Sequence, residues 1–201
     1  MAQGMYAQSK WFFRAFNALF AEGSPCREKA VESYTDNTAF TRFITGEINE
    51  IIRERGYIAQ NEYYRIDAMG YTSRGKTLPE ADGLHPFLWD LEIAVEHENS
   101  SKDWLDEVIK LAHICCPLRV VIGYVPVDQR EKGDEARLAY AADALGQLKC
   151  RDNLRSGEFM VILGNSGTAG KEERFFNYKA YVLNPEEFRF EPLENDEGGT
   201  L

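Results

Sequence analysis

The spacing of hydrophobic residues predicts three helices in the first third of the chain. An apolar stripe with a helical period runs over residues 10–20 and ends before Gly23. A Ser-Pro pair begins a second segment over 24–34, as an N-cap and a first-turn proline do. Over 38–55, six Phe and Ile residues keep the helical period and stop before Gly56, so this segment gives the clearest helix of the region.

Beyond residue 56 the pattern becomes that of strands. Residues 57–71 are rich in Tyr and Ile with imperfect alternation, which predicts an extended segment, and 73–86 form a long turn with Gly, Lys, Pro and Asp. Over 87–98 the odd positions up to Val95 are apolar, and most even positions carry acids. This strict alternation is the strongest strand prediction in the chain.

Helices and strands alternate in the second half. A capping pattern at Ser100 introduces a helix that begins near Trp104 and that Pro117 ends. A buried strand follows over 118–125, then a helix over 131–148 and two strands over 159–163 and 178–183. We therefore predict an α/β protein with a mixed central sheet flanked by helices.

The length of 201 residues suits one domain with a full hydrophobic core. We expect a single domain over 1–190, with an N-terminal helical addition at 1–36 and a core motif at 38–125. Residues 191–201 combine Asn, Asp, Glu and paired Gly, which predicts a flexible acidic tail.

The charge balance limits the partners that the chain can attract. It has 23 Lys and Arg against 33 Asp and Glu, a net charge of −10, which argues against long-range attraction to DNA or to an anionic membrane. No apolar run approaches the roughly 20 residues of a membrane helix, and we see no targeting signal. We expect a cytoplasmic protein without membrane association.

Acidic residues gather on one side of the strand predicted at 87–98. Asp90, Glu92, Glu96 and Glu98 alternate with its apolar positions, and no Lys or Arg shares their face. Like charges in a row repel, so this pattern suggests a missing cation, and a hard divalent ion such as Mg²⁺ takes oxygen ligands. The alternative is the solvent-facing side of an antiparallel sheet.

Asp67 is the candidate for a further ligand. It lies in a strand-like segment before the long turn, and a hairpin-like return of the chain would bring it beside Glu96. An ion pair with Arg65, two residues earlier on the same face, is the competing interpretation.

The order of these elements resembles the restriction-endonuclease-like PD-(D/E)XK nuclease superfamily. A helix with Glu47, a strand with Asp67, a strand with Glu96 and Glu98, a helix with Lys110 and an apolar strand follow one another over 38–125. The resemblance implies an αβββαβ core preceded by N-terminal helices. It also implies that Asp67 and Glu96 bind Mg²⁺ or Mn²⁺ together with the backbone carbonyl of the residue after Glu96.

The chain departs from the family pattern at several positions. Glu98 stands where the family usually has lysine, and by the resemblance it would bind metal or accept a proton from the attacking water. Lys110 is the candidate for a lysine that has moved to the following helix, and Glu47 matches an acid that many members place near the metal. The proline before Asp67 is absent, and only one clear strand precedes the strand of Glu96.

The resemblance implies metal-assisted hydrolysis of phosphodiester bonds in nucleic acid, with DNA as the expected substrate. Local cations would hold the backbone of the nucleic acid, and a homodimer is expected by analogy. A non-catalytic binding or regulatory protein with the same fold is the alternative, and an acidic protein that mimics nucleic acid is a third. The cations considered are Arg65, Arg74, Lys76 and Lys102.

Overall fold

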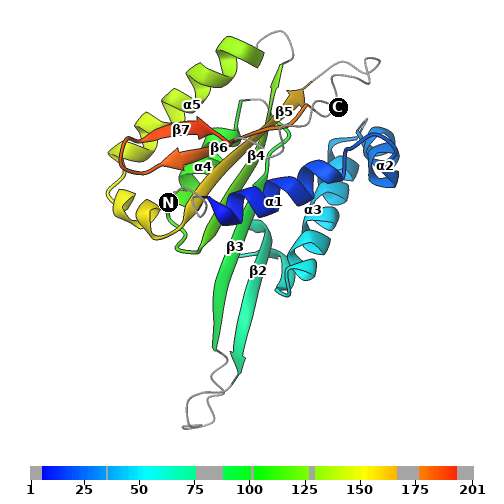
Figure 1. The fold of residues 1–201 in the computed structure, drawn as a ribbon, viewed down its shortest axis with the longest axis horizontal. Coiled ribbons are helices and arrows are strands. Elements are labelled where there is room, and N and C mark those ends of the chain that lie inside the picture. The colour runs from blue at the N-terminus through cyan, green and yellow to red at the C-terminus, as the bar shows by residue number, and fades with distance from the viewer. Residues whose placement is uncertain are drawn as a thin grey trace.

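The computed structural model describes residues 6–34, 36–75, 88–100, 102–126, 130–166 and 177–193 (Figure 1). The helices are α1 (Ala7–Ala18), α2 (Pro25–Ser33), α3 (Asn37–Glu54), α4 (Trp104–Ala112) and α5 (Arg130–Gln147), with a 3₁₀ helix η2 (Arg151–Ser156). The strands are β1 (Ile58–Tyr63), β2 (Ile66–Gly75), β3 (Leu88–His97), β4 (Leu118–Pro126), β5 (Glu158–Ser166), β6 (Lys179–Asn184) and β7 (Arg189–Pro192). These bounds agree closely with the helices predicted from hydrophobic period.

The seven strands form one mixed sheet in chain order, β1 to β7. The β3–β4 and β4–β5 pairs are parallel, and the other four pairs are antiparallel. Helices α1 and α3 cover one face of the sheet, and α4 and α5 cover the other (Figure 1). The predicted α/β class with a mixed, helix-flanked sheet is confirmed.

Each face of the sheet has its own hydrophobic core. The central strand β4 is buried along its whole length except for its last residue, because both of its faces are covered. Val120 packs with the aromatic stripe of α1 and the isoleucines of α3, whereas its neighbour Val121 packs with α4 and α5. The near-continuous apolar run of this strand follows from burial on both faces.

The segment predicted as one extended stretch over 57–71 is a hairpin. Tyr63 pairs with Ile66, so Tyr64 and Arg65 form a two-residue turn between β1 and β2. Such turns usually carry Asn-Gly, and the Tyr-Arg pair gave no turn signal. Two strands therefore precede β3 rather than one, and the order from α3 to β4 is helix, three strands, helix, strand.

A β-bulge interrupts the regular alternation of β3. The register with β2 moves from Gly70–Ile93 to Tyr71–Leu91, which leaves Glu92 as an extra residue. As a result Ile93 packs on the α1 and α3 side, whereas Leu91 packs on the α4 and α5 side. The prediction that all four acids of this strand share one face is wrong, because the bulge reverses the faces between the outer and inner halves of the strand.

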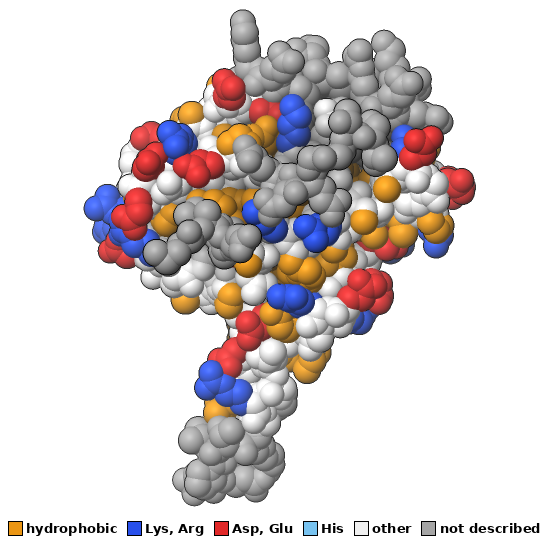
Figure 2. All heavy atoms as spheres, viewed as in Figure 1, with side chains coloured by type: hydrophobic (Ala, Val, Ile, Leu, Met, Phe, Trp, Pro, Cys, Tyr) orange, Lys and Arg blue, Asp and Glu red, His pale blue; other side chains and the backbone are white. Residues whose placement is uncertain are grey.

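The outer half of the β2–β3 hairpin projects away from the rest of the sheet (Figure 1). It is visible as a narrow arm in the space-filling view, below a body whose visible face mixes acidic, basic and hydrophobic side chains (Figure 2). No helix within the described ranges is long and apolar enough to span a lipid bilayer.

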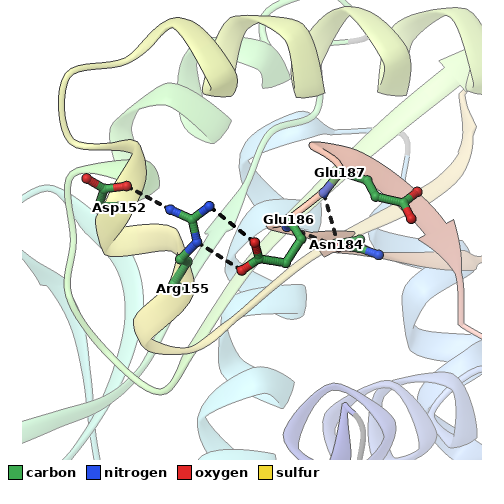
Figure 3. A network of polar contacts seen from close by, with 5 residues as sticks. All are labelled: Asp152, Arg155, Asn184, Glu186 and Glu187. Atoms are coloured by element: carbon green, nitrogen blue, oxygen red, sulfur yellow. Dashed lines mark hydrogen bonds and ion pairs between the residues drawn. The ribbon is translucent and has the colours of Figure 1, made fainter.

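Strand β7 extends the sheet past residue 190, where the sequence predicted the start of a tail. Arg155 of η2 donates to the carboxylate of Glu186 in the turn before β7, and the side chain of Asn184 accepts the backbone N–H of Glu186 and Glu187 (Figure 3). Leu193 also packs against the core of the α1 and α3 face. The remainder of the predicted tail, 194–201, lies outside the described residues.

Candidate functional site

Asp67 and Glu96 lie side by side on neighbouring strands. The antiparallel register pairs Ala68 with Val95, which places Asp67 across from Glu96. The backbone N–H of His97 donates to Asp67 Oδ2 at 2.9 Å, and the Asp67 and Glu96 carboxyl groups are close enough for each to influence the pKa of the other. The expected pairing of these two acids is present, and it results from the return of the chain through the β2–β3 hairpin.

Glu96 is the most buried acid of the site. Its side chain is 1% exposed, and its Oε1 has no hydrogen-bond partner. Burial raises the pKa of Glu96 to about 8, with the nearby charge of Asp67 adding to the effect and the hydrogen bond from Lys110 opposing it. A buried carboxyl group with an unpaired oxygen is costly unless it is protonated or binds a cation.

Lys110 of α4 contacts Glu96. Its Nζ lies 2.9 Å from Glu96 Oε2, contacts Glu107 Oε2, and donates to the backbone carbonyl of Arg65 at 3.1 Å. Partial burial disfavours the charged amine, but the bonds to Glu107 and Glu96 outweigh it and raise the pKa of Lys110. Lys110 is therefore an ammonium group that joins α4, β3 and the β1–β2 turn.

Asp67 is only partly buried and faces an open hollow of 610 Å³. Burial raises its pKa, although the N–H of His97 and the charge of Lys110 act in the opposite direction. Glu98 also lines the hollow, and its Oε1 accepts the backbone N–H of Ser100 at 2.6 Å. Asp67 and Glu98 thus share a solvent-accessible space, while Glu96 lies behind it.

The first half of α3 forms one wall of this hollow. Thr41, Arg42 and Thr45 line it together with Asp67 and Glu98. Arg42 was not among the predicted site residues, because a single exposed arginine on a helix carries no motif. The sequence does place Arg42 on the same helix face as Thr38 and Thr45, because residues three or four apart are neighbours on a helix. This spacing was the only indication that Arg42 could join them.

Glu47 lies on a different face of α3 and does not line the hollow. Its Oε2 accepts a hydrogen bond from Cys26 Sγ of α2 at 3.4 Å. Two residues after Thr45 the helix has turned by more than half a revolution, which directs Glu47 toward α2 instead of toward Asp67. The structure therefore does not bring Glu47 together with Asp67 and Glu98 at the hollow.

His97 points into the core. Its side chain packs beside Phe40, and its Nε2 is 2.9 Å from the hydroxyl of Tyr124. Burial lowers the pKa of His97 to about 3, so the imidazole is neutral at physiological pH. Only its backbone takes part in the candidate site.

The outer acids of β3 have partners within the hairpin arm. Asp90 forms an ion pair with Arg74, and Glu92 Oε1 accepts from the hydroxyl of Thr72 at 3.0 Å. Arg74 is thereby engaged away from Asp67, and Lys102 is exposed just before α4. Lys76, the remaining predicted cation, lies outside the described residues.

The donor set suits a small hard cation with few protein ligands. Within the described ranges no three His, Cys, Asp or Glu side chains converge as metal ligands, so Glu98 does not join Asp67 and Glu96 as a third one here. Two neighbouring carboxylates nevertheless suit Mg²⁺, which uses one or two carboxylates and commonly keeps several waters. Oε1 of Glu96 is buried and has no hydrogen-bond partner, so it is not already engaged by another group.

Comparison with known proteins does not identify a family for this chain. No family model matches the sequence, and no curated protein matches it. Among solved structures, the central domain of yeast acetyl-CoA carboxylase is similar at 12% identity and a TM-score of 0.37, over 91% of this chain and 34% of that chain. The chain thus spans about a third of that protein's structure, and a TM-score this low does not show a shared fold.

Proposed function

We propose that the chain is a divalent-metal-dependent nuclease that hydrolyses phosphodiester bonds of nucleic acid. The observation that carries the proposal is the buried carboxyl of Glu96, with one oxygen unpaired, beside Asp67 and 2.9 Å from Lys110. The order helix, three strands, helix, strand from α3 to β4 also supports it, because it agrees with the αβββαβ core of the PD-(D/E)XK superfamily.

Each residue of the site would have a distinct role. Asp67 and Glu96, with the backbone carbonyl of His97, would hold Mg²⁺ or Mn²⁺. The bound ion would supply a Lewis acid that activates water and neutralises charge on the phosphate. Lys110 would bind a phosphate oxygen, and Glu98, at the open hollow, would accept a proton from the attacking water.

The substrate would enter from the hollow in front of Asp67. Arg42 supplies a cation on its α3 wall, so that a phosphate can be held locally although the chain has a net charge of −10. We propose DNA as the substrate and the cytoplasm as the location. A second copy of the chain would be needed if both strands of a duplex are cut together.

Cleavage assays with isosteric variants test this proposal. We expect the wild-type chain to cleave DNA with Mg²⁺ or Mn²⁺ and not with EDTA, and Asp67→Asn and Glu96→Gln to lower the rate at least a hundredfold. Asp90→Asn is the matched control, since this acid pairs with Arg74 in the hairpin arm, and it should cleave at the wild-type rate. Equal rates for all four proteins would refute the proposal.

A non-catalytic binding or regulatory protein with this fold is the second candidate. The observation that favours it is that Lys110 already engages Glu96 Oε2 at 2.9 Å, while Glu98 occupies the usual position of the motif lysine. Such a protein would bind nucleic acid without cleaving it at any metal concentration. The same assay, combined with a gel-shift measurement on the wild-type chain, separates the two candidates.

A further inference from the structure

The turn between β1 and β2 has an unfavourable backbone for its residues. Tyr64 and Arg65 have φ values of 52° and 61°, and Glu62 before them has φ of 52°. Two-residue turns of this kind require positive φ at both positions, which Asn-Gly adopts readily and side chains with a bulky Cβ substituent do not. The turn geometry alone would favour Asn-Gly over Tyr-Arg.

The two side chains of this turn are exposed. Tyr64 keeps 76% of its surface accessible, and Arg65 is exposed as well. The ring of Tyr63 supports the ring of Tyr64 edge-on, with centroids 4.4 Å apart, and Trp89 supports Tyr63 in turn at 6.0 Å. The turn therefore exposes an aromatic ring and a guanidinium group to solvent, and the aromatic ring packs against Tyr63.

The turn also borders the candidate site. The carbonyl of Arg65 accepts from Lys110 Nζ at 3.1 Å, and the same Nζ lies 2.9 Å from Glu96. Asp67 follows Tyr64 by three residues, and three residues of extended chain span about 10 Å. Residues at the turn are thus within reach of a strand bound at Asp67.

We propose that Tyr64 and Arg65 bind an unpaired nucleotide of the substrate strand next to the site. Its base stacks on the ring of Tyr64, and its phosphate pairs with the guanidinium of Arg65. This assignment rests on the proposed nuclease function and adds that the substrate is single-stranded where it crosses the turn. It accounts for the presence of two residues that the turn itself disfavours.

The double variant Tyr64→Asn/Arg65→Gly separates binding from folding. Because Asn-Gly fits the turn, we expect its Tm to rise by about 4 °C. We also expect its affinity for a fluorescein-labelled oligo(dT) strand, measured by anisotropy with Ca²⁺ in place of Mg²⁺, to fall about tenfold or more. Tyr64→Phe keeps the ring and should retain binding. Tyr140→Asn removes another exposed tyrosine, on α5, and should also bind as wild type.

Each result has a definite meaning. Wild-type affinity of the double variant, from a chain that cleaves DNA, would overturn the role of the turn and leave the nuclease proposal intact. An equal loss of affinity for duplex DNA would overturn the assignment to an unpaired nucleotide, and a fall in Tm would overturn the argument from backbone strain. If the wild-type chain neither binds nor cleaves nucleic acid, both proposals fail.

Discussion

Glu96 and His97 are neighbours in sequence whose pKa values shift in opposite directions. Both are buried, and burial disfavours the charged form of each, so the pKa of Glu96 rises to about 8 and that of His97 falls to about 3. The strand directs them to opposite faces, which separates a titrating carboxyl group from a permanently neutral imidazole. On one face of β3, Glu96 contacts Lys110, and on the other face, His97 contacts Tyr124 in the core.

These two residues predict a specific dependence of stability on pH. The folded chain keeps the Glu96 proton between pH 4.5 and about 8 while the unfolded chain has lost it, so Glu96 makes stability fall as pH rises across that window. His97 has the opposite effect between about pH 3 and pH 6.5, where only the unfolded chain binds its proton. The two effects oppose each other up to pH 6.5, and above it Glu96 acts without His97.

Urea unfolding in EDTA at pH 6.5 and pH 8 measures this effect. We expect the free energy of unfolding of the wild-type chain to fall by on the order of 2 kcal/mol over this interval. Glu96→Gln cannot ionise and should show a much smaller change. A fall of the same size in the variant would show that another group is responsible.

At the scale of elements, hydrophobic period predicted the helices and the central strands well. Helix α3 is predictable because burial of one face leaves apolar residues at a helical period, and strand β4 because burial of both faces leaves a continuous apolar run. The turn at Tyr64 and Arg65 left no such record, since its residues are not turn formers, and so β1 and β2 were read as one segment. The short strand β7 was missed for a similar reason, because it sits among acidic residues.

The candidate site was predictable where it depends on strand neighbours and not where it depends on the orientation of a side chain. Asp67 and Glu96 meet because two adjacent strands must align. The bulge at Glu92 and the orientation of Glu47 are set by packing against other elements, which a single sequence does not reveal. Lys110 was found only through the resemblance to a family whose lysine can move.

Two glycines test how tightly the elements are packed. A Cβ at Gly157 would lie 2.5 Å from the carbonyl oxygen of Cys116 and 2.7 Å from that of Pro117, both backbone atoms, whereas a Cβ at Gly46 on α3 meets nothing within 4 Å. We expect Gly157→Ala to lower the free energy of unfolding by about 2 kcal/mol or more. Gly46→Ala should raise it by about 0.5 to 1 kcal/mol.

Thermal and urea unfolding of both glycine variants would check this pair. Arg119 depends on the same region, because its buried guanidinium donates to the carbonyls of Ile114, Asn153 and Gly157. Gly157→Ala should therefore also disturb the contact of η2 with β4. A stable Gly157→Ala protein would contradict the close backbone approach at the start of β5.

At the scale of the whole molecule, both layers of helices contribute to one site. Helix α3, on one face of the sheet, forms a wall of the hollow, and α4, on the other face, supplies Lys110. These contributions come together around Asp67 and Glu96, which lie on the paired strands β2 and β3. The arrangement therefore requires the complete tertiary fold.

The net negative charge of the chain opposes the binding of nucleic acid. A chain with a net charge of −10 does not attract nucleic acid at long range, so a nuclease of this kind depends on a cation held at Asp67 and Glu96. Binding of that cation is the step on which the proposed hydrolysis rests, whichever nucleic acid is cut.

Isothermal titration calorimetry with Mn²⁺ tests this claim most directly. We expect the wild-type chain at pH 8 to bind the ion at a site that both Asp67→Asn and Glu96→Gln abolish, and that Asp90→Asn leaves unchanged. Absence of binding by the wild-type chain, or binding that survives both substitutions, would contradict the account.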